Sequence, residues 1–149
     1  DSFRDHFSHV IEPFETGFPR WQHIWSRYQP IDPALWLVAE TDDGEMAGVC
    51  LCKPEHPAQA ELGWVSTLGV RRDYRRSGLG IALLRQSFVN FQQRGKTGVG
   101  LGVDASSLTG ATRLYERAGM KVVLRFDLYE KELRGGVDMT VTDLEEESG

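Results

Sequence analysis

The chain has 149 residues, of which 40% are hydrophobic and 26% are charged, as in an ordinary globular domain. Its formal net charge of −5 argues against nucleic acid as a partner, and its apolar runs are too short to cross a membrane. The opening residues do not read as a signal peptide, so we expect a cytoplasmic protein. Residues 1–149 are expected to form one domain that ends in an acidic tail at 143–149.

Hydrophobic periodicity and turn residues predict helices and strands in chain order. The first half predicts two helices, interrupted at Pro13, and then three strands: helices at 2–9 and 18–28, strands at 35–40, 46–53 and 61–70. The second half predicts two more helices and two strands: helices at 78–94 and 110–118, strands at 98–104 and 121–131. The alternation at 137–141 leaves a further short strand open.

An arginine-rich turn separates the predicted strand at 61–70 from the long helix at 78–94. A helix start presents free N–H groups, and the helix dipole there favours an anion. Gly78 and Gly80 have no side chain, so a phosphate oxygen can approach the main chain. Four nearby cations strengthen the case for a pyrophosphate: Arg71, Arg72, Arg75 and Arg76.

The glycine spacing decides which phosphate-binding turn this is. A P-loop needs a glycine where Asn90 stands, and a dinucleotide-binding fingerprint needs one where Leu83 stands. The pattern that is present, Arg75-x-x-Gly78-x-Gly80, resembles the [QR]-x-x-G-x-[GA] acyl-CoA motif of the GNAT superfamily of N-acyltransferases.

A second segment, residues 103–120, is similar to the downstream signature of that family, V-D-x-x-N-x-x-x-A-x-x-L-Y-x-x-x-G-F. Ala111, Leu114 and Tyr115 fall on one face of a short helix, and Ser107 stands where the family has asparagine. The resemblance extends from the first helix to about residue 133. It is closest to the C-terminal half of tandem, mycothiol-synthase-like acetyltransferases.

The resemblance implies an α/β fold: a mixed, mainly antiparallel sheet with helices on both faces. The family's first strand has no counterpart here. Either it was removed with a preceding domain, or residues 137–141 cover that sheet edge. The strands at 61–70 and 98–104 are expected to diverge, with acetyl-CoA in the gap. No metal is expected. The implied cofactor-binding residues are Leu68, Gly69, Val70, Arg75, Arg76, Ser77, Gly78, Leu79, Gly80, Ser107 and Ala111.

Glycines at every second position of the strand at 98–104 leave one face without side chains. Two interpretations remain open for Gly98, Gly100 and Gly102. They allow a neighbouring element to pack closely, or they leave room for the cofactor.

The implied reaction is acetyl transfer from acetyl-CoA to a primary amine of a small molecule, by direct attack. The implied acid for the leaving thiolate is Tyr115, whose alternative role is packing against the cofactor. Trp64 occupies the usual place of the glutamate base. A water relay, Glu40, Glu61 or His56 remains open as its substitute.

The alternative function is a catalytically silent acyl-CoA-binding module that senses its ligand or supports a partner domain. A preceding GNAT domain and a second copy of the chain are the expected protein partners. Trp25 and Trp64 are the candidate substrate contacts, although the aromatic stripe at 21–28 is also typical of core packing. Cys50 and Cys52 are expected to be buried free thiols.

Overall fold

The computed structural model describes residues 13–26, 31–56, 58–103, 110–127, 129, 131 and 133–135. Four strands form one sheet in the order β1-β2-β3-β4. Their bounds are β1 Trp36–Glu40, β2 Met46–Lys53, β3 Leu62–Val70 and β4 Gly98–Leu101. The pairs β1–β2 and β2–β3 are antiparallel, whereas β3–β4 is parallel. The sheet is therefore mixed and mainly antiparallel, which confirms the predicted class.

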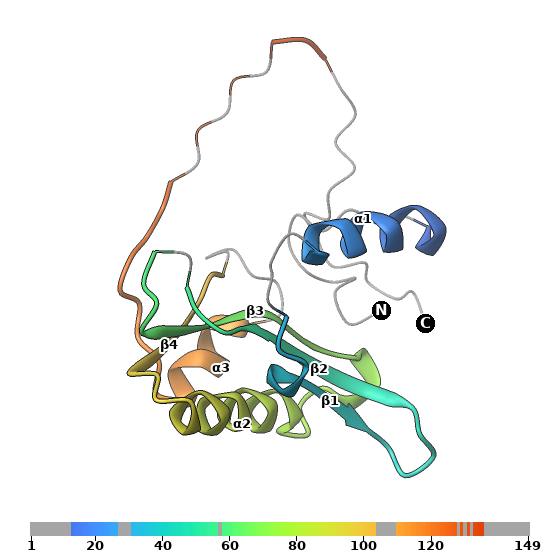
Figure 1. Ribbon diagram of the computed structural model, residues 1–149. Helices are drawn as coiled ribbons and strands as arrows, with labels where there is room; N and C mark the ends of the chain where they lie inside the picture. The colour runs from blue at the N-terminus through green and yellow to red at the C-terminus, as the bar shows by residue number, and fades with distance from the viewer. Residues whose placement is uncertain are drawn as a thin grey trace.

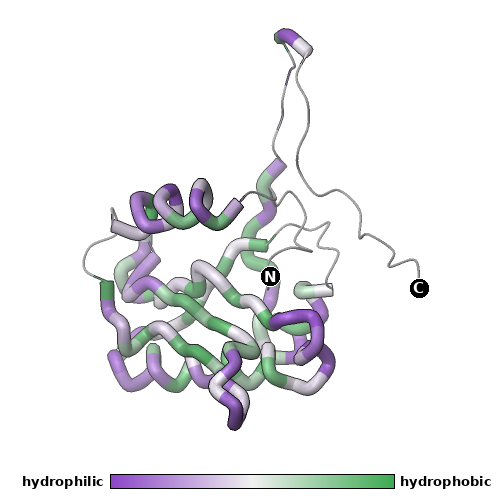
Figure 2. Tube along the Cα trace, turned by 90° about the vertical axis from the view of Figure 1, so that its right-hand side faces the viewer, coloured by the Kyte–Doolittle hydropathy of each residue, from purple (hydrophilic) through white to green (hydrophobic). Residues whose placement is uncertain are grey.

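Helices cover both faces of this sheet, as predicted (Figure 1). The helices α2 (Leu79–Gln93) and α3 (Ala111–Arg117) lie on one face, and α1 (Phe14–Ser26) lies over the other. Two short 3-10 helices, η1 (Pro33–Leu35) and η2 (Arg72–Tyr74), lead into β1 and toward α2. Figure 2 shows the apolar strands inside the molecule and the hydrophilic turns at their ends.

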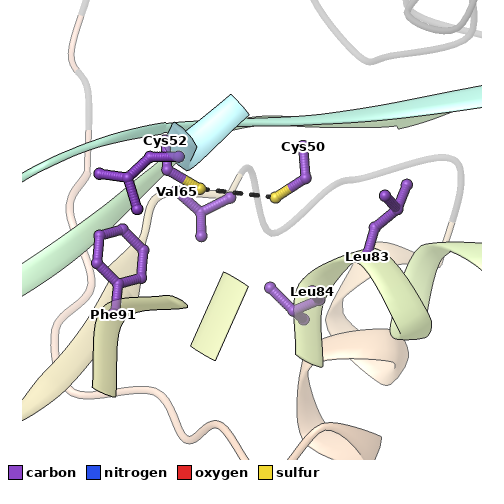
Figure 3. Packing of buried hydrophobic residues seen from close by; sticks show 7 residues of the cluster. Cys50, Cys52, Val65, Leu83, Leu84 and Phe91 are labelled. Atoms are coloured by element: carbon purple, nitrogen blue, oxygen red, sulfur yellow. Dashed lines mark hydrogen bonds between the residues drawn. The ribbon is translucent and has the colours of Figure 1, made fainter. Parts of the chain in front are cut away.

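The core lies between α2 and the sheet. Figure 3 shows Cys50, Cys52 and Val65 facing the α2 residues Leu83, Leu84 and Phe91. Phe91 is fully buried and lies so close to Gly63 that a Cβ there would overlap its ring. Because Gly63 has no side chain, α2 can approach β3 closely at this point. The contact between Gly63 and Phe91 therefore sets the distance between α2 and β3.

Cys50 and Cys52 are buried free thiols, as predicted, and their sulfur atoms are 3.7 Å apart. The hydrogen bond with Cys50 and burial both raise the pKa of the Cys52 thiol, so Cys52 stays protonated at neutral pH. We therefore assign these thiols to the core.

The first described helix begins earlier than predicted. The Pro13 carbonyl accepts hydrogen bonds from the amides of Thr16 and Gly17, both at 3.0 Å, so this proline starts α1. Pro19 lies inside α1. The predictions for 2–9, 137–141, Tyr28 and the acidic tail fall outside the described residues.

The predicted strand at 121–131 is wrong over its described part, because residues 121–127 have no regular structure. The side chains of Val122, Val123, Leu124 and Phe126 are 65% to 87% exposed, so none of the described strands covers them. Apolar and polar residues alternate in this segment as they do in a strand. A strand also needs a neighbouring strand to supply its hydrogen bonds, and sequence alternation does not provide one. β4 is likewise shorter than predicted, since its pairing with β3 ends at Leu101.

Candidate active site

The parallel strands β3 and β4 part halfway along β3. Their pairing runs from Leu62–Gly98 to Val65–Leu101. Beyond Val65, β3 continues to Val70 paired only with β2 among the described strands. The second half of β3 therefore has no strand partner on its β4 side in the part of the chain that the structure describes. This agrees with the predicted divergence of the two strands.

Hydrogen bonding to β2 decides which main-chain groups face the gap. The Arg71 amide donates to the Ala47 carbonyl at 2.9 Å, and Val70, Gly69 and Leu68 then pair with successive β2 residues. Because bonded and non-bonded pairs alternate in an antiparallel ladder, Leu68 and Val70 direct their polar groups away from β2. Gly69 directs its own toward β2. The gap is thus lined by main-chain donors and acceptors of Leu68 and Val70.

The turn between β3 and α2 contains two residues whose backbone is in the left-handed conformation. Arg76 has φ +61° and Gly78, the N-cap of α2, has φ +88°. A Cβ at Gly78 would meet nothing within 4 Å, so the space above the turn is open. No side chain of Gly78 can cap the helix, and the start of α2 is available to an anion.

Gly80 serves a different purpose from Gly78. A Cβ at Gly80 would lie 2.9 Å from Cδ1 of Leu114, so this glycine lets the start of α2 approach α3. Ser77 holds the turn, because its hydroxyl donates to the Tyr74 carbonyl at 2.7 Å and accepts from the Leu79 amide at 3.4 Å.

The arginines of the turn have different environments. Arg71 Nη1 donates to the Met46 carbonyl at 3.2 Å and to Glu45 at 3.4 Å, so its charge is partly neutralised. Arg75 Nε donates to the Val70 carbonyl at 3.1 Å, which holds its guanidinium beside the end of β3. Arg76 is exposed next to the start of α2. Arg75 is thus held at the end of β3, and Arg76 is exposed two residues before Gly78.

Tyr115 lies on α3 and packs against the core cluster. Burial raises the pKa of the Tyr115 phenol, so the side chain remains a proton donor at neutral pH. Ala111 begins α3, and Ser107 falls outside the described residues.

Trp64 covers the glycine face of β4. A Cβ at Gly100 would lie 2.9 Å from Cζ3 of Trp64, and one at Gly98 would lie 2.8 Å from Cδ2 of Leu62. This favours the packing interpretation of the glycines. The ring of His56 packs edge-on against the ring of Trp64, with 4.7 Å between the ring centres.

The candidate bases differ in their surroundings. Glu40 and Glu61 are both exposed, at the end of β1 and just before β3. The Nδ1 atom of His56 accepts the Ala58 amide at 3.1 Å, so the proton of a neutral His56 resides on Nε2. The Nε2 atom of a neutral His56 is therefore a hydrogen-bond donor. The surroundings of Glu40 and Glu61 do not distinguish either carboxylate as the base.

Aromatic residues join α1 to the sheet. Trp25 is 7% exposed and its ring meets that of Trp36 edge-on at 5.2 Å, while Lys53 lies 5.7 Å from the Trp25 ring centre. Trp21 also contacts Trp36, at 6.2 Å. The predicted aromatic stripe is thus packing at its Trp25 end, and this packing sets the position of α1 over the sheet.

The sequence interpretation missed Ser66, which lies where β3 and β4 part. Leu51 pairs with Thr67 and Cys52 pairs with Val65, so Ser66 is left without a partner on β2. Its hydroxyl is buried and makes no hydrogen bond to the residues that the structure describes. A serine within a strand gives no sequence signal of a bulge, because the bulge depends on the register between two strands.

Across the described ranges, no helix is long and apolar enough to span a membrane, and no group of three or more His, Cys, Asp or Glu is arranged to hold a metal ion.

Comparison with known proteins agrees with this geometry. Residues 4–120 match the acetyltransferase (GNAT) family. The chain is 33% identical over 92 residues to the mycothiol acetyltransferase of Propionibacterium freudenreichii subsp. shermanii, a match that covers 62% of this chain and 29% of that protein.

Solved structures give the same result. The GCN5-related N-acetyltransferase from Sphaerobacter thermophilus is 40% identical with a TM-score of 0.62, over 80% of this chain and 36% of that one. The aminoglycoside N-acetyltransferase AAC(6')-Iy in complex with CoA shares the fold at 12% identity and a TM-score of 0.57, over 79% of this chain and 90% of that one. The chain thus spans about a third of the length of its more similar relatives. From the family match over most of its residues, the chain belongs to the GNAT family of acetyltransferases.

Proposed function

We propose that this chain transfers an acetyl group from acetyl-CoA to a primary amine of a small molecule by direct attack. The proposal rests on two neighbouring features, the gap beside β3 and the open start of α2. The main-chain groups of Leu68 and Val70 face the gap beside β4, and the open start of α2 at Gly78 lies just beyond the end of that gap. A ligand with an amide-bearing arm and a pyrophosphate fits this succession.

The residues of the turn would hold the pyrophosphate. The helix start at Gly78, Leu79 and Gly80 offers N–H groups, and Ser77 stabilises the turn. Arg75 and Arg76 add positive charge. The main-chain groups of Leu68 and the Val70 amide would bond to the amides of the arm, while the Val70 carbonyl keeps its bond from Arg75. Ala111 with Ser107 would approach the arm from the α3 side.

Tyr115 would protonate the leaving thiolate. In direct transfer, the amine nitrogen bonds to the thioester carbon, the carbon–sulfur bond breaks, and the sulfur receives a proton. The raised pKa of Tyr115 keeps that proton on the phenol until the thiolate leaves. Trp64 would contact the acceptor, whereas the buried Trp25 supports the position of α1. The amine of the acceptor would lose its own proton through a water relay.

One observation favours a second candidate, a silent acyl-CoA-binding module. The place of the family glutamate is filled by Trp64, whose ring is packed across Gly100. Such a module would bind acetyl-CoA without transferring the acetyl group, and would support a catalytic partner domain.

We also propose that residues 1–149 act as one acetyltransferase domain next to a further domain or a second copy of the chain. The short coverage of the relatives supports a larger arrangement, since the match accounts for 29% and 36% of two of them. Acetyl-CoA is available in the cytoplasm, where we place the reaction.

Two measurements test the proposal. Calorimetry with acetyl-CoA, ATP and NAD is expected to give binding for acetyl-CoA alone. Release of CoA thiol in the presence of a panel of primary amines is expected to identify an acceptor. Binding without release from any amine would favour the silent module, and absence of acetyl-CoA binding would contradict both functions.

A further inference from the structure

The turn between β1 and β2 (residues 41–45) and the turn before α2 (residues 71–78) lie at the same end of the sheet (Figure 1). Gly48 of β2 pairs with Val70, the last residue of β3, so the two turns leave the sheet next to each other. A side chain of the β1–β2 turn can therefore reach the turn that is proposed to bind the pyrophosphate.

Glu45 and Tyr74 join the two turns through their side chains. The Tyr74 hydroxyl donates to Oε2 of Glu45 at 3.1 Å. This hydrogen bond raises the pKa of the Tyr74 phenol, so Tyr74 keeps its proton at neutral pH and remains the donor. Hydrogen bonds to an ionised acceptor are stronger than those between neutral groups. The pair therefore connects a residue of the β1–β2 turn to the end of η2.

Arg71 also contacts Glu45, but it contributes less to this connection. Its Nη1 atom lies 3.4 Å from Oε2 of Glu45, and the Glu45 side chain is 59% exposed. The guanidinium also donates to the Met46 carbonyl at 3.2 Å and lies 5.7 Å from the centre of the Tyr74 ring. Ion pairs and cation–π contacts at exposed positions stabilise by small amounts. We therefore assign the connection chiefly to Tyr74.

Glu45 is held in place by its own turn. The Glu45 amide donates to the Thr41 hydroxyl at 3.1 Å, and the Thr41 amide donates to the Glu45 carbonyl at 2.9 Å. The Gly44 amide donates to the Thr41 carbonyl at 2.9 Å, and a Cβ at Gly44 would meet no atom within 4 Å. The next residue, Met46, begins β2 and pairs with β1. The carboxylate thus extends from a part of the chain that the sheet keeps in position.

Tyr74 is connected in turn to the start of α2. The Ser77 hydroxyl donates to the Tyr74 carbonyl at 2.7 Å and accepts from the amide of Leu79, the first residue of α2, at 3.4 Å. Within the same turn, Arg76 has a left-handed backbone, with φ +61°. This conformation is unfavourable for a residue with a side chain and persists only where the surroundings hold it. The hydrogen bonds from Glu45 through Tyr74 and Ser77 supply such support.

We propose that Glu45 and Tyr74 are positioning residues for acetyl-CoA, which hold the turn before α2 in the conformation that receives the pyrophosphate. This inference rests on the proposed function, since it takes acetyl-CoA as the ligand of the turn. Neither side chain needs to touch the ligand. Because the turn is already ordered, less conformational freedom is lost when the pyrophosphate binds. Charge alone predicts the opposite for Glu45, since a carboxylate near a phosphate weakens its binding.

Tyr74→Phe removes the hydroxyl and changes no charge. We expect it to weaken acetyl-CoA binding about fivefold in calorimetry, the usual net effect of one hydrogen bond, and to raise KM equally while kcat is kept. Glu45→Ala and Glu45→Gln both remove the charge, but only glutamine keeps an oxygen that can accept from Tyr74. Glu45→Ala should therefore bind acetyl-CoA about fivefold more weakly than Glu45→Gln. Equal affinities of these two variants, or tighter binding by Glu45→Ala, overturn the inference.

The matched control removes a surface carboxylate at the other end of α2. Oδ2 of Asp32 accepts from Nε and Nη2 of Arg94 at 3.1 and 3.0 Å, about 22 Å along the helix from Leu79. Asp32→Ala also deletes the cap of η1, where Oδ1 accepts the Ala34 amide at 3.0 Å. It should lower the melting temperature and leave acetyl-CoA affinity unchanged. Tyr74→Phe should lower the melting temperature less and the affinity more, a combination that a merely structural role would not give.

Hydrogen exchange in the free protein tests the positioning directly. Peptides that cover residues 72–79 should exchange faster in Tyr74→Phe and Glu45→Ala than in the wild type and Glu45→Gln, whereas residues 83–93 should be unchanged. Unchanged exchange over 72–79 in Tyr74→Phe overturns the inference, as does an acetyl-CoA affinity within twofold of the wild type. If the wild type binds acetyl-CoA but turns over no amine, transfer fails while the affinities still decide the role of Glu45 and Tyr74. If acetyl-CoA does not bind, both fail.

Discussion

Placing a negative charge on the open turn at the start of α2 should weaken acetyl-CoA binding without disturbing the fold. Gly78→Asp adds a carboxylate at an exposed position where a Cβ would meet no atom within 4 Å, so the Cβ itself causes no steric overlap. The φ of +88° disfavours any residue with a side chain, at a cost of about 1 kcal/mol. In a protein of this size, that cost lowers the melting temperature by about 2–4 °C.

The electrostatic part of the effect is larger. Two unit charges about 4 Å apart near a protein surface repel by about 4 kcal/mol. Gly78 is exposed, so screening by water and salt reduces this to about 2 kcal/mol, or about 30-fold in affinity. Raising the salt concentration should reduce the difference further.

Two controls isolate the charge. Gly78→Asn has nearly the same shape and the same backbone strain but carries no charge, so it should bind acetyl-CoA at least tenfold more tightly than Gly78→Asp by calorimetry. Gly44→Asp introduces the same residue at another open, left-handed glycine (φ +80°), in the β1–β2 hairpin. It should leave affinity unchanged. Equal affinities for the Asp and Asn variants at position 78 would refute the reasoning that the pyrophosphate lies on this turn.

Three further predictions test the remaining parts of the site. Tyr115→Phe keeps the ring but removes the proton, so turnover should fall about 10²-fold at nearly constant acetyl-CoA affinity; an equal loss in both would mean that Tyr115 positions the ligand. Arg76→Ala should weaken acetyl-CoA binding about tenfold by calorimetry, whereas Arg71→Ala, whose guanidinium already contacts Glu45, should change it less than twofold; the reverse order would contradict this assignment. Gly100→Ala places a Cβ 2.9 Å from the Trp64 ring and should lower the unfolding free energy by about 1–3 kcal/mol in urea titrations; unchanged stability would show that Trp64 is not held against β4.

Local patterns predicted the parts of this protein whose chemistry is local. The turn at Gly78 and the helix that carries Tyr115 were predicted from short motifs, and the structure has a left-handed Gly78 before α2 and places Tyr115 on α3; their roles in binding and catalysis stay predictions. The buried thiols Cys50 and Cys52 followed from strand alternation in the same way. Each of these inferences needs only one element and its neighbours in sequence.

The features that were missed depend on contacts between distant segments. The irregularity of β3 at Ser66 is defined only by the β2–β3 register, which leaves this residue without a partner on β2. The glycines of β4 could have allowed a neighbouring element to pack closely or have left room for the cofactor, and the contact between Gly100 and Trp64 favours close packing. The segment 121–127 alternates like a strand, but alternation says nothing about whether a neighbouring strand is in place.

The contact between Gly80 and Leu114 has a consequence for how the two ends of the site cooperate. Leu114 is adjacent to Tyr115, so the distance between α2 and α3 at this point also sets where the phenol lies. An alanine at position 80 would press on Cδ1 of Leu114, the far end of a flexible side chain, which can rotate aside. A larger residue would instead push α3 away from α2 and carry Tyr115 with it. Gly80 therefore acts as a spacer between the start of α2 and the helix that carries Tyr115, so a substitution at the proposed anion site would also displace the proposed proton donor.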